Sequence, residues 1–110
     1  MEAPKYQESD VKLNKDQKTF YIDLQSGKKA IVNYENIDLN TIEVWHTEVP
    51  DENRGQGIAG ILASKSISEL AKTNPDKKII LSCTYLQAYH KKNPEKFKSF
   101  DNIQWKKKDF

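Results

Sequence analysis

The sequence predicts a mixed α/β domain of the α+β type, in which an antiparallel meander precedes a β-α-β crossover and a short C-terminal helix. Apolar and polar residues alternate through the first half of the chain, as in strands with one buried face. After residue 60 the apolar residues recur with the helical period of about 3.6 residues. A glycine-rich segment, 54–60, separates these two patterns, and a short aliphatic run follows the helical one.

The meander is predicted from three strands, over 19–24, 29–34 and 41–49. The residues 25–28 (Gln-Ser-Gly-Lys) favour a turn, so the first two strands are expected to form a hairpin. A second turn is expected over 35–40. The third strand ends before a proline, because proline has no N–H to donate to a sheet.

The crossover begins with a helix after the glycine-rich segment. Its buried face is predicted from residues at helical spacing: Ala59, Leu62, Ala63, Ser66, Ile67, Leu70 and Ala71. The helix ends at Asn74-Pro75, and the aliphatic run 78–84 predicts a buried parallel strand. Such a strand-helix-strand unit is expected to be right-handed. A short helix then follows over 85–92 and ends at Asn93-Pro94.

The 110 residues allow one domain, which is expected over 18–98. Residues 1–17 are polar and show almost no apolar periodicity, so they are predicted to be a flexible N-terminal segment. Residues 99–110 are predicted to be a basic, irregular C-terminal tail.

Composition indicates an intracellular protein of the cytoplasm or nucleus. No apolar stretch approaches the roughly 18 residues that a membrane span requires, and no secretory signal is visible. The single cysteine, Cys83, cannot form an internal disulfide. The net charge of +2 is too small to indicate specific nucleic-acid binding. We therefore expect no membrane or nucleic-acid partner and no metal site, and the oligomeric state stays open.

The segment Arg54-Gly55-Gln56-Gly57-Ile58-Ala59-Gly60 predicts a phosphate-binding loop. It contains three of the four glycines and lies between the third strand and the first helix. Glycines allow successive backbone N–H groups to face a ligand, and the helix adds its unpaired N-terminal donors and the positive end of its dipole.

Two known nucleotide-binding motifs fit this loop poorly. Gly55-x-Gly57-x-x-Gly60 formally matches the dinucleotide fingerprint, which also requires an acidic residue about 20 positions on, at the end of the next strand. Residues 79–84 contain no acidic residue, and few residues remain for further βα units. A P-loop is disfavoured because no Gly-Lys-Ser/Thr follows.

The loop also reads as Arg54-x-x-Gly57-x-Ala59, and in this frame it resembles the Arg/Gln-x-x-Gly-x-Gly/Ala pattern of the GCN5-related N-acetyltransferases. The resemblance extends over roughly residues 14–97 to a minimal branch of that superfamily. The residues that carry it are the following: His46-Thr47-Glu48-Val49-Pro50, Arg54-Gly55-Gln56-Gly57, Cys83 and Tyr89-His90-Lys91-Lys92-Asn93-Pro94. In this frame Gly60 is a close-packing position in the first helical turn.

This resemblance implies an acetyl-CoA-dependent N-acetyltransferase with a truncated form of the family fold, in which two parallel strands splay apart. It implies transfer to a primary amine, of lysine or another acceptor, by direct attack in a ternary complex; an open acceptor site favours the amine of a peptide or protein. The residues implied to bind coenzyme A are Thr47, Val49, Arg54, Gly55, Gln56, Gly57, Ile58 and Ala59. The chain looks too short for the two further strands of larger members, which leaves the acceptor site open. The alternatives are a coenzyme A or acyl-CoA binding module without effective catalysis, and a protein whose loop holds another anion.

Two residues of the third strand are candidates for the base that deprotonates the amine. His46 and Glu48 are two apart and therefore share one face of a strand. Histidine titrates near neutral pH, which suits proton abstraction from an ammonium group. The alternatives are that His46 packs beside Trp45 and that Glu48 forms a salt bridge or contacts the substrate amine.

Three further candidate residues lie at the end of the second parallel strand and on the short helix after it. Cys83 is a candidate for a nucleophile, for a proton donor to the leaving thiolate, or for a small buried residue. Tyr85 and Tyr89 are four apart and lie on one side of the short helix. By the resemblance, a phenol such as that of Tyr89 protonates the coenzyme thiolate; the alternative is that both rings anchor the helix.

Overall fold

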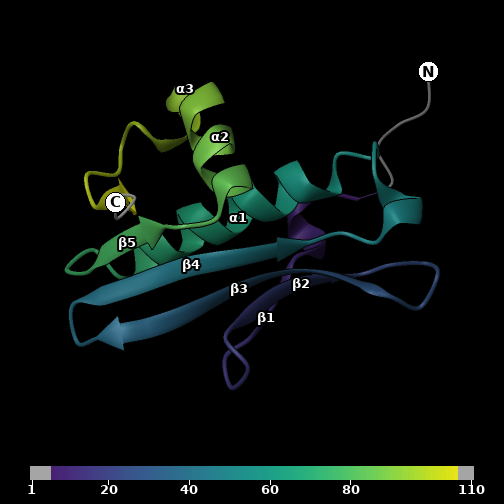
Figure 1. The fold of residues 1–110 in the computed structure, drawn as a ribbon, viewed down its shortest axis with the longest axis horizontal. Helices are drawn as coiled ribbons and strands as arrows, with labels where there is room; N and C mark the ends of the chain where they lie inside the picture. Colours follow the sequence, from purple (N-terminus) through teal and green to yellow (C-terminus); the bar gives the residue numbers. More distant parts are fainter. Residues whose placement is uncertain (1–5, 107–110) are drawn as a thin grey trace, which may run out of the picture.

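The computed structural model describes residues 6–106, which form a six-stranded sheet with α1 along one face (Figure 1). The elements follow in this order: η1 (Glu8–Asp10), β1 (Lys12–Asn14), β2 (Thr19–Asp23), β3 (Lys29–Asp38), β4 (Thr41–Glu48), η2 (Asp51–Asn53), α1 (Ile58–Thr73), β5 (Lys78–Leu81), α2 (Thr84–Lys92), α3 (Pro94–Phe97) and β6 (Ile103–Trp105). The strands lie in chain order. Neighbours from β1 to β4 are antiparallel, whereas β4, β5 and β6 are parallel. The predicted mixed α/β class is confirmed.

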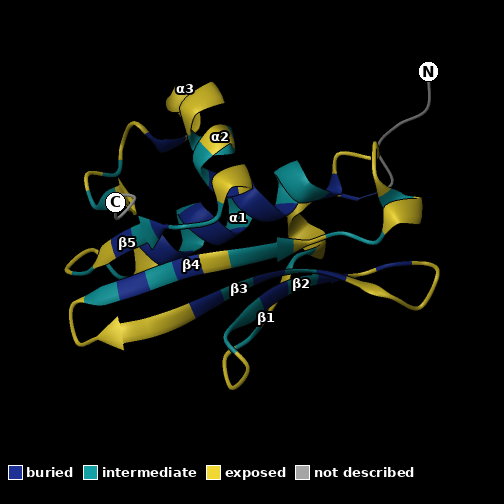
Figure 2. Ribbon diagram, in the orientation of Figure 1, coloured by how far each residue is buried: buried dark blue, intermediate teal, exposed yellow. Residues whose placement is uncertain are grey.

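Helix α1 covers the sheet with the face that its sequence predicts (Figure 2), except that Ala59 is only half-buried and lines a cavity. Leu62 and Ile67 are completely buried against the strands. The buried stripe is wider than predicted and includes Ile58 and Ser64, since η1 and α2 also contact α1. The helix ends where the side-chain amide of Asn74 donates to a carbonyl of the last turn, at 3.0 Å. Within residues 6–106, no helix is both long and apolar enough to cross a membrane.

Strand β3 is longer than predicted and includes most of the segment 35–40, where we expected a turn. Glu35 pairs with Glu43 and Asp38 pairs with Thr41, so the turn itself is short. The outer half of β3, residues 35–38, is exposed, although Ile42 opposite it on β4 is buried. Because neither face is buried there, no apolar alternation marks the strand in the sequence.

A β-bulge interrupts the pairing of β3 with β4. Asn33 pairs with His46, and the next residue, Tyr34, pairs with Val44, which leaves Trp45 without a partner in the ladder. One additional residue in a strand shifts every following side chain to the other face of the sheet. The bulge therefore divides β4 into two parts with opposite phases.

The two phases are visible in the surroundings of the side chains. Ile42 and Val44 are buried in the core under α1. Beyond the bulge, Thr47 and Val49 face the N-terminal end of α1, where they line a cavity. A regular strand would have kept 42, 44, 46 and 48 on one face. The end of β4 thus presents its odd-numbered residues toward the helix.

Strands β4 and β5 separate at one end. Their parallel pairing runs from Thr41 with Lys78 to Val44 with Leu81. The last bond joins the N–H of Ser82 to the carbonyl of Val44, at 3.1 Å. From His46 onward, β4 pairs only with β3. The splayed parallel strands implied by the resemblance are present, and the free edge of β4 opens a gap between the strands.

The structure corrects two predictions near the ends of the chain. Part of the predicted flexible segment 1–17 forms β1, which pairs with β2, and part of the predicted irregular tail 99–110 forms β6, which pairs with β5. Both strands have three residues, too few for a periodic pattern, and backbone pairing with a longer neighbour holds them. The chain therefore has a further strand after β5, where we expected none. Residues 1–5 and 107–110 lie outside the described residues.

Candidate cofactor and catalytic site

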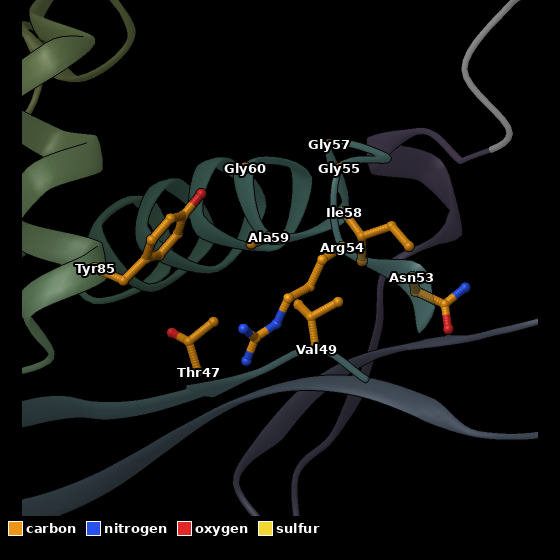
Figure 3. Close-up of a pocket in the computed structure, with 10 residues that line it drawn as sticks. All are labelled: Thr47, Val49, Asn53, Arg54, Gly55, Gly57, Ile58, Ala59, Gly60 and Tyr85. Atoms are coloured by element: carbon orange, nitrogen blue, oxygen red, sulfur yellow. The ribbon is translucent and has the colours of Figure 1, made fainter. Parts of the chain in front are cut away.

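A cavity of about 420 Å³ lies between the glycine loop, the end of β4 and α2 (Figure 3). This volume is in the range of roughly 300–1,000 Å³ that is typical of small-molecule sites. The lining residues are Thr47, Val49, Asn53, Arg54, Gly55, Gly57, Ile58, Ala59, Gly60 and Tyr85. Every residue predicted to bind the cofactor lines this first cavity, with the exception of Gln56.

The loop adopts a conformation that glycine permits and other residues rarely adopt. Gly55 has φ of +84° and Gly57, the N-cap of α1, has φ of +77°. A Cβ at either position would meet no atom within 4 Å, so these glycines provide backbone rotation rather than space. Among the described residues, no backbone N–H from Gly55 to Gly60 donates to another backbone group; the first bond of the helix joins the N–H of Ile61 to Gly57. These free donors at a helix N-terminus suit an anion.

Two polar side chains of the loop complete this end of the cavity. Arg54 extends toward the end of β4 in Figure 3, and its guanidinium forms an ion pair with Asp51, at 3.2 Å. The amide nitrogen of Asn53 donates to Gln56, at 3.3 Å, whereas its Oδ1 is buried without a hydrogen-bond partner. Asn53 was not among the predicted site residues, and nothing in its sequence context marks it.

Gly60 allows α1 and α2 to approach each other closely. A Cβ at Gly60 would lie 3.3 Å from the Cε2 atom of Tyr89 and 3.9 Å from the hydroxyl of Tyr85. The predicted close-packing role of Gly60 is confirmed. The two tyrosines nevertheless differ: the ring of Tyr85 lines the cavity, whereas that of Tyr89 packs edge-on against Phe97, with 6.1 Å between the centroids.

The phenol of Tyr85 is held in its protonated form. Burial raises the pKa of Tyr85 above its usual value, and the neighbouring Tyr89 and Cys83 add to this effect. A neutral phenol can donate a proton to a basic group beside it. Tyr85 lines the cavity, whereas Tyr89, the tyrosine named above as the predicted proton donor to the thiolate, does not.

Cys83 and Thr47 meet where the two strands separate. The thiol of Cys83 lies 3.6 Å from the hydroxyl oxygen of Thr47, in hydrogen-bond contact between the end of β5 and β4. Cys83 is half-buried and occupies the N-cap position of α2, where its side chain makes no capping hydrogen bond. Thr47 lines the first cavity, so the Cys83 sulfur lies beside the inner end of that cavity.

His46 and Glu48 are placed outside the first cavity. The ring of His46 stacks on Trp45, with 5.4 Å between the centroids and 29° between the planes. Consecutive residues of a regular strand point to opposite faces, so this stack is a consequence of the bulge. Glu48 is exposed and lines a second cavity, which lies at the end of β4 beside Lys28, Lys29 and Asp51. The two candidate bases thus lie on the face of the sheet opposite Thr47 and Val49.

The first cavity offers backbone donors, one arginine and a phenol, with a thiol beside its inner end. Within residues 6–106, no group of three or more His, Cys, Asp or Glu side chains could hold a metal ion. Of the predicted catalytic residues, the structure brings only Cys83 to the first cavity, through Thr47. Tyr89 lies one helical turn behind Tyr85, with 6.4 Å between the rings.

Comparison with known proteins gives one family. The family model described as GCN5-related N-acetyl-transferase matches residues 19–100, a range that includes every residue of the first cavity. Protein NATD1 of Xenopus tropicalis is 41% identical over 66 residues, which cover 60% of this chain and 59% of that protein. Protein NATD1 of Homo sapiens is 39% identical over 66 residues, and that of Danio rerio 36% over 85 residues, or 76% of each chain. The aligned part thus spans less than two thirds of the first of these relatives.

Proposed function

The chain belongs to the GCN5-related N-acetyltransferase family, and from this premise we propose that it transfers the acetyl group of acetyl-CoA to a primary amine. The observation that carries the proposal is the continuity of the first cavity. It begins at the glycine loop and the N-terminus of α1 and reaches Thr47, beside Cys83, where β4 and β5 separate. An elongated ligand with phosphates at one end and a thioester at the other matches this shape.

The loop end of the cavity suits the pyrophosphate of coenzyme A. Free N–H groups from Gly55 to Gly60, the dipole of the 16-residue helix α1 and the charge of Arg54 converge there. Val49 and Thr47 provide the strand edge along which the pantetheine arm would extend. When bound, acetyl-CoA supplies an activated acetyl group at its thioester. The residues of the chain hold and orient it and transfer protons.

The acceptor amine is protonated near neutral pH and must lose a proton before it can attack a carbonyl. We assign the role of the base that accepts this proton to His46 or Glu48, which lie on the face of the sheet opposite the first cavity. An acceptor that approaches from this face meets the gap between β4 and β5 from the side opposite the cofactor. The two substrates then approach the reacting carbonyl from opposite faces of the sheet.

Tyr85 is our candidate for the donor that protonates the departing thiolate, because its neutral phenol lines the first cavity. Tyr89 holds Tyr85 in place in this proposal. The thiol of Cys83 donates a hydrogen bond to the hydroxyl of Thr47, so we assign Cys83 a positioning role, with direct attack by the amine. Mass spectrometry of the protein during turnover tests this assignment, since an acetylated Cys83 would indicate a covalent route.

A second candidate function is coenzyme A or acyl-CoA binding without effective catalysis. One observation favours it: His46 is stacked on Trp45 and lies outside the first cavity. A phosphate-binding loop can operate without a base.

Two measurements separate the candidates. Calorimetric titration with acetyl-CoA and with ADP tests the site, and binding of neither would overturn both candidate functions. Incubation with acetyl-CoA and a library of lysine peptides, followed by mass spectrometry, tests turnover. A product heavier by one acetyl group supports the enzyme, and binding without product supports the binding module. If His46→Ala and Glu48→Ala both keep the full rate, the assignment of the base is wrong.

A further inference from the structure

A third cavity, of about 480 Å³, lies at the C-terminal end of α1. The turn between β1 and β2, the strands β2 to β4 and the last turns of α1 contribute to its lining. None of the lining residues lines the first or the second cavity. Leu70, which lines the third cavity, lies about 18 Å along α1 from Ile58, which lines the first. The third cavity is therefore separate from the site proposed for coenzyme A.

Part of the lining of the third cavity is apolar. Phe20, Ile42 and Leu70 line it and belong to the hydrophobic core. Leu13, on the edge strand β1, also lines it and is exposed. A ligand with an apolar body would cover the surface of these side chains and remove it from water.

Cations outnumber carboxylates in the third cavity. The charged lining residues are three lysines and one glutamate: Lys15, Lys18, Lys77 and Glu69. Lys18 pairs with Glu35 at 3.4 Å, a residue outside the lining. Glu69 pairs with Lys65 at 3.5 Å, which is also outside it. The two remaining cations, Lys15 and Lys77, thus give the cavity an excess of two positive charges.

This excess is not compensated by nearby carboxylates. Lys15 and Lys77 form no ion pair with any described residue. Asp16 and Asp76, their neighbours in the chain, form no ion pair within residues 6–106 either. The C-terminal end of the α1 dipole, equivalent to about half a negative charge, offsets only part of the excess. An anion is the class of ligand that these charges favour.

Tyr34 supplies a neutral hydrogen-bond donor to the third cavity. It lines the cavity, is only 9% exposed, and its ring packs beside that of Phe20, with 5.7 Å between the centroids. Its hydroxyl forms no hydrogen bond with any described residue, whereas a tyrosine buried to this extent normally has a partner for its hydroxyl. Burial raises the pKa of Tyr34, so the phenol stays protonated and can donate to an anion.

The turn that carries Lys15 is fixed beside Tyr34. The backbone N–H of Lys18 donates to the carbonyl of Lys15, at 3.3 Å. The carbonyl of Lys18 accepts from the backbone N–H of Tyr34, at 3.0 Å. A donor and a cation on one ordered unit lose less conformational entropy when a ligand binds.

We propose that the third cavity binds a small organic anion with an apolar body, such as an aromatic or short aliphatic carboxylate. The ammonium groups of Lys15 and Lys77 and the hydroxyl of Tyr34 contact the anionic group. Phe20 and Leu70 contact the apolar body. This inference goes beyond the proposed function and does not depend on it, because the two sites share no residue.

The test is an NMR titration of the isotope-labelled protein with 3-phenylpropionate. The alcohol 3-phenylpropan-1-ol has the same body without the charge, and inorganic phosphate has charge without the body. The carboxylate is expected to shift the amide signals of Lys15, Tyr34 and Lys77 and to bind about fivefold or more tighter than the alcohol. Absence of carboxylate binding would overturn the site. Equal affinity for the alcohol would overturn charge recognition, and equal affinity for phosphate would overturn the role of the apolar body.

Three variants assign the contacts. Lys15→Gln and Lys77→Gln are each expected to weaken 3-phenylpropionate binding about two- to fivefold, because both cations are near solvent. Tyr34→Phe is expected to weaken it about tenfold, since a hydrogen bond to a charged group is lost, and to keep its stability, since the hydroxyl has no described partner. An unchanged affinity in Tyr34→Phe would contradict the role of the phenol.

Lys72→Gln is the matched control for the lysines. Lys72 is exposed on the last turn of α1 and does not line the third cavity, so its replacement removes the same charge from nearby. The affinity for 3-phenylpropionate is expected to stay at the wild-type value. If Lys72→Gln and Lys77→Gln lose equally, the effect comes from net charge and the assignment of Lys77 is wrong.

Saturating coenzyme A separates this inference from the proposed function. The affinity for 3-phenylpropionate is expected to be the same with and without coenzyme A, because the cavities share no lining residue. Displacement of the carboxylate by coenzyme A would place it in the first cavity and overturn the third cavity as its site. If coenzyme A does not bind while the carboxylate does, the proposed function fails and the anion site stands.

Discussion

Replacing Gly57 by alanine separates the conformational role of the glycine loop from general stability. Gly57 has φ of +77°, and a Cβ there would meet no atom within 4 Å, so the cost of alanine arises only from the left-handed backbone. For a residue with a side chain this conformation costs about 1–2 kcal/mol. In a domain of this size, where 1 kcal/mol corresponds to about 4–8 °C, the melting temperature should fall by about 4–16 °C.

Gly27 provides a matched control. It has φ of +88°, it also has no atom within 4 Å of an added Cβ, and it lies in the turn between β2 and β3, outside the first cavity. Gly27→Ala should therefore lower the melting temperature by a similar amount. Only Gly57→Ala should also weaken coenzyme A binding, because a relaxed loop turns the N–H groups at the start of α1 away from the ligand.

The affinity of Gly57→Ala for coenzyme A is expected to fall about tenfold or more, since a single hydrogen bond to a charged group contributes about 1.5–3 kcal/mol. Thermal unfolding and calorimetric titration with coenzyme A measure the two effects on the same samples. If Gly57→Ala binds coenzyme A as tightly as Gly27→Ala does, the backbone of this loop is not the phosphate site. Gly57→Asn should recover part of the stability, because asparagine tolerates the left-handed region.

Three further predictions concern the remaining elements. In the acetylation assay, Tyr85→Phe should lower kcat by about 100-fold and Tyr89→Phe should change it little, since only Tyr85 lines the first cavity; equal losses would contradict the assignment. The indole N–H of Trp105 donates to Nδ1 of His90 at 3.0 Å, and burial lowers the pKa of His90 below its usual value. The unfolded chain therefore binds more protons between the two pKa values, so stability should be complete above about pH 6.5 and decrease as the pH falls toward the folded-state pKa. His90→Gln should flatten this dependence in denaturant titrations across pH, and an unchanged slope would exclude His90 as its source. Ile67→Ala, at a completely buried position of α1, should reduce the free energy of unfolding by about 2–5 kcal/mol; a loss below about 1 kcal/mol in urea titration would contradict the packing of α1 on the sheet.

The predictions of α1, α2 and the glycine-rich loop, which depended on local patterns, agree with the structure. The hydrophobic period identified α1 and its buried face, and proline after asparagine marked the end of α1 and of α2. The glycine pattern placed the left-handed residues Gly55 and Gly57 at the start of a helix. The strands β1 and β6 and the outer half of β3 were missed. The first two are too short to show a periodic pattern, and the third has no buried face. All three are held by backbone pairing with a neighbouring strand.

The sequence by itself determined the order of the elements from β2 to α2 and the position of the glycine-rich loop. Both depend on properties of neighbouring residues: the period of apolar side chains and the φ values that glycine allows. Only the tertiary structure decided which side chains share a cavity. The bulge at Trp45 directs Thr47 and Val49 toward the first cavity and places Glu48 at the second, and the gap between β4 and β5 brings Cys83 to Thr47. Strand register is set by a partner strand that is distant in sequence, so one unpaired residue changes the face of all that follow it.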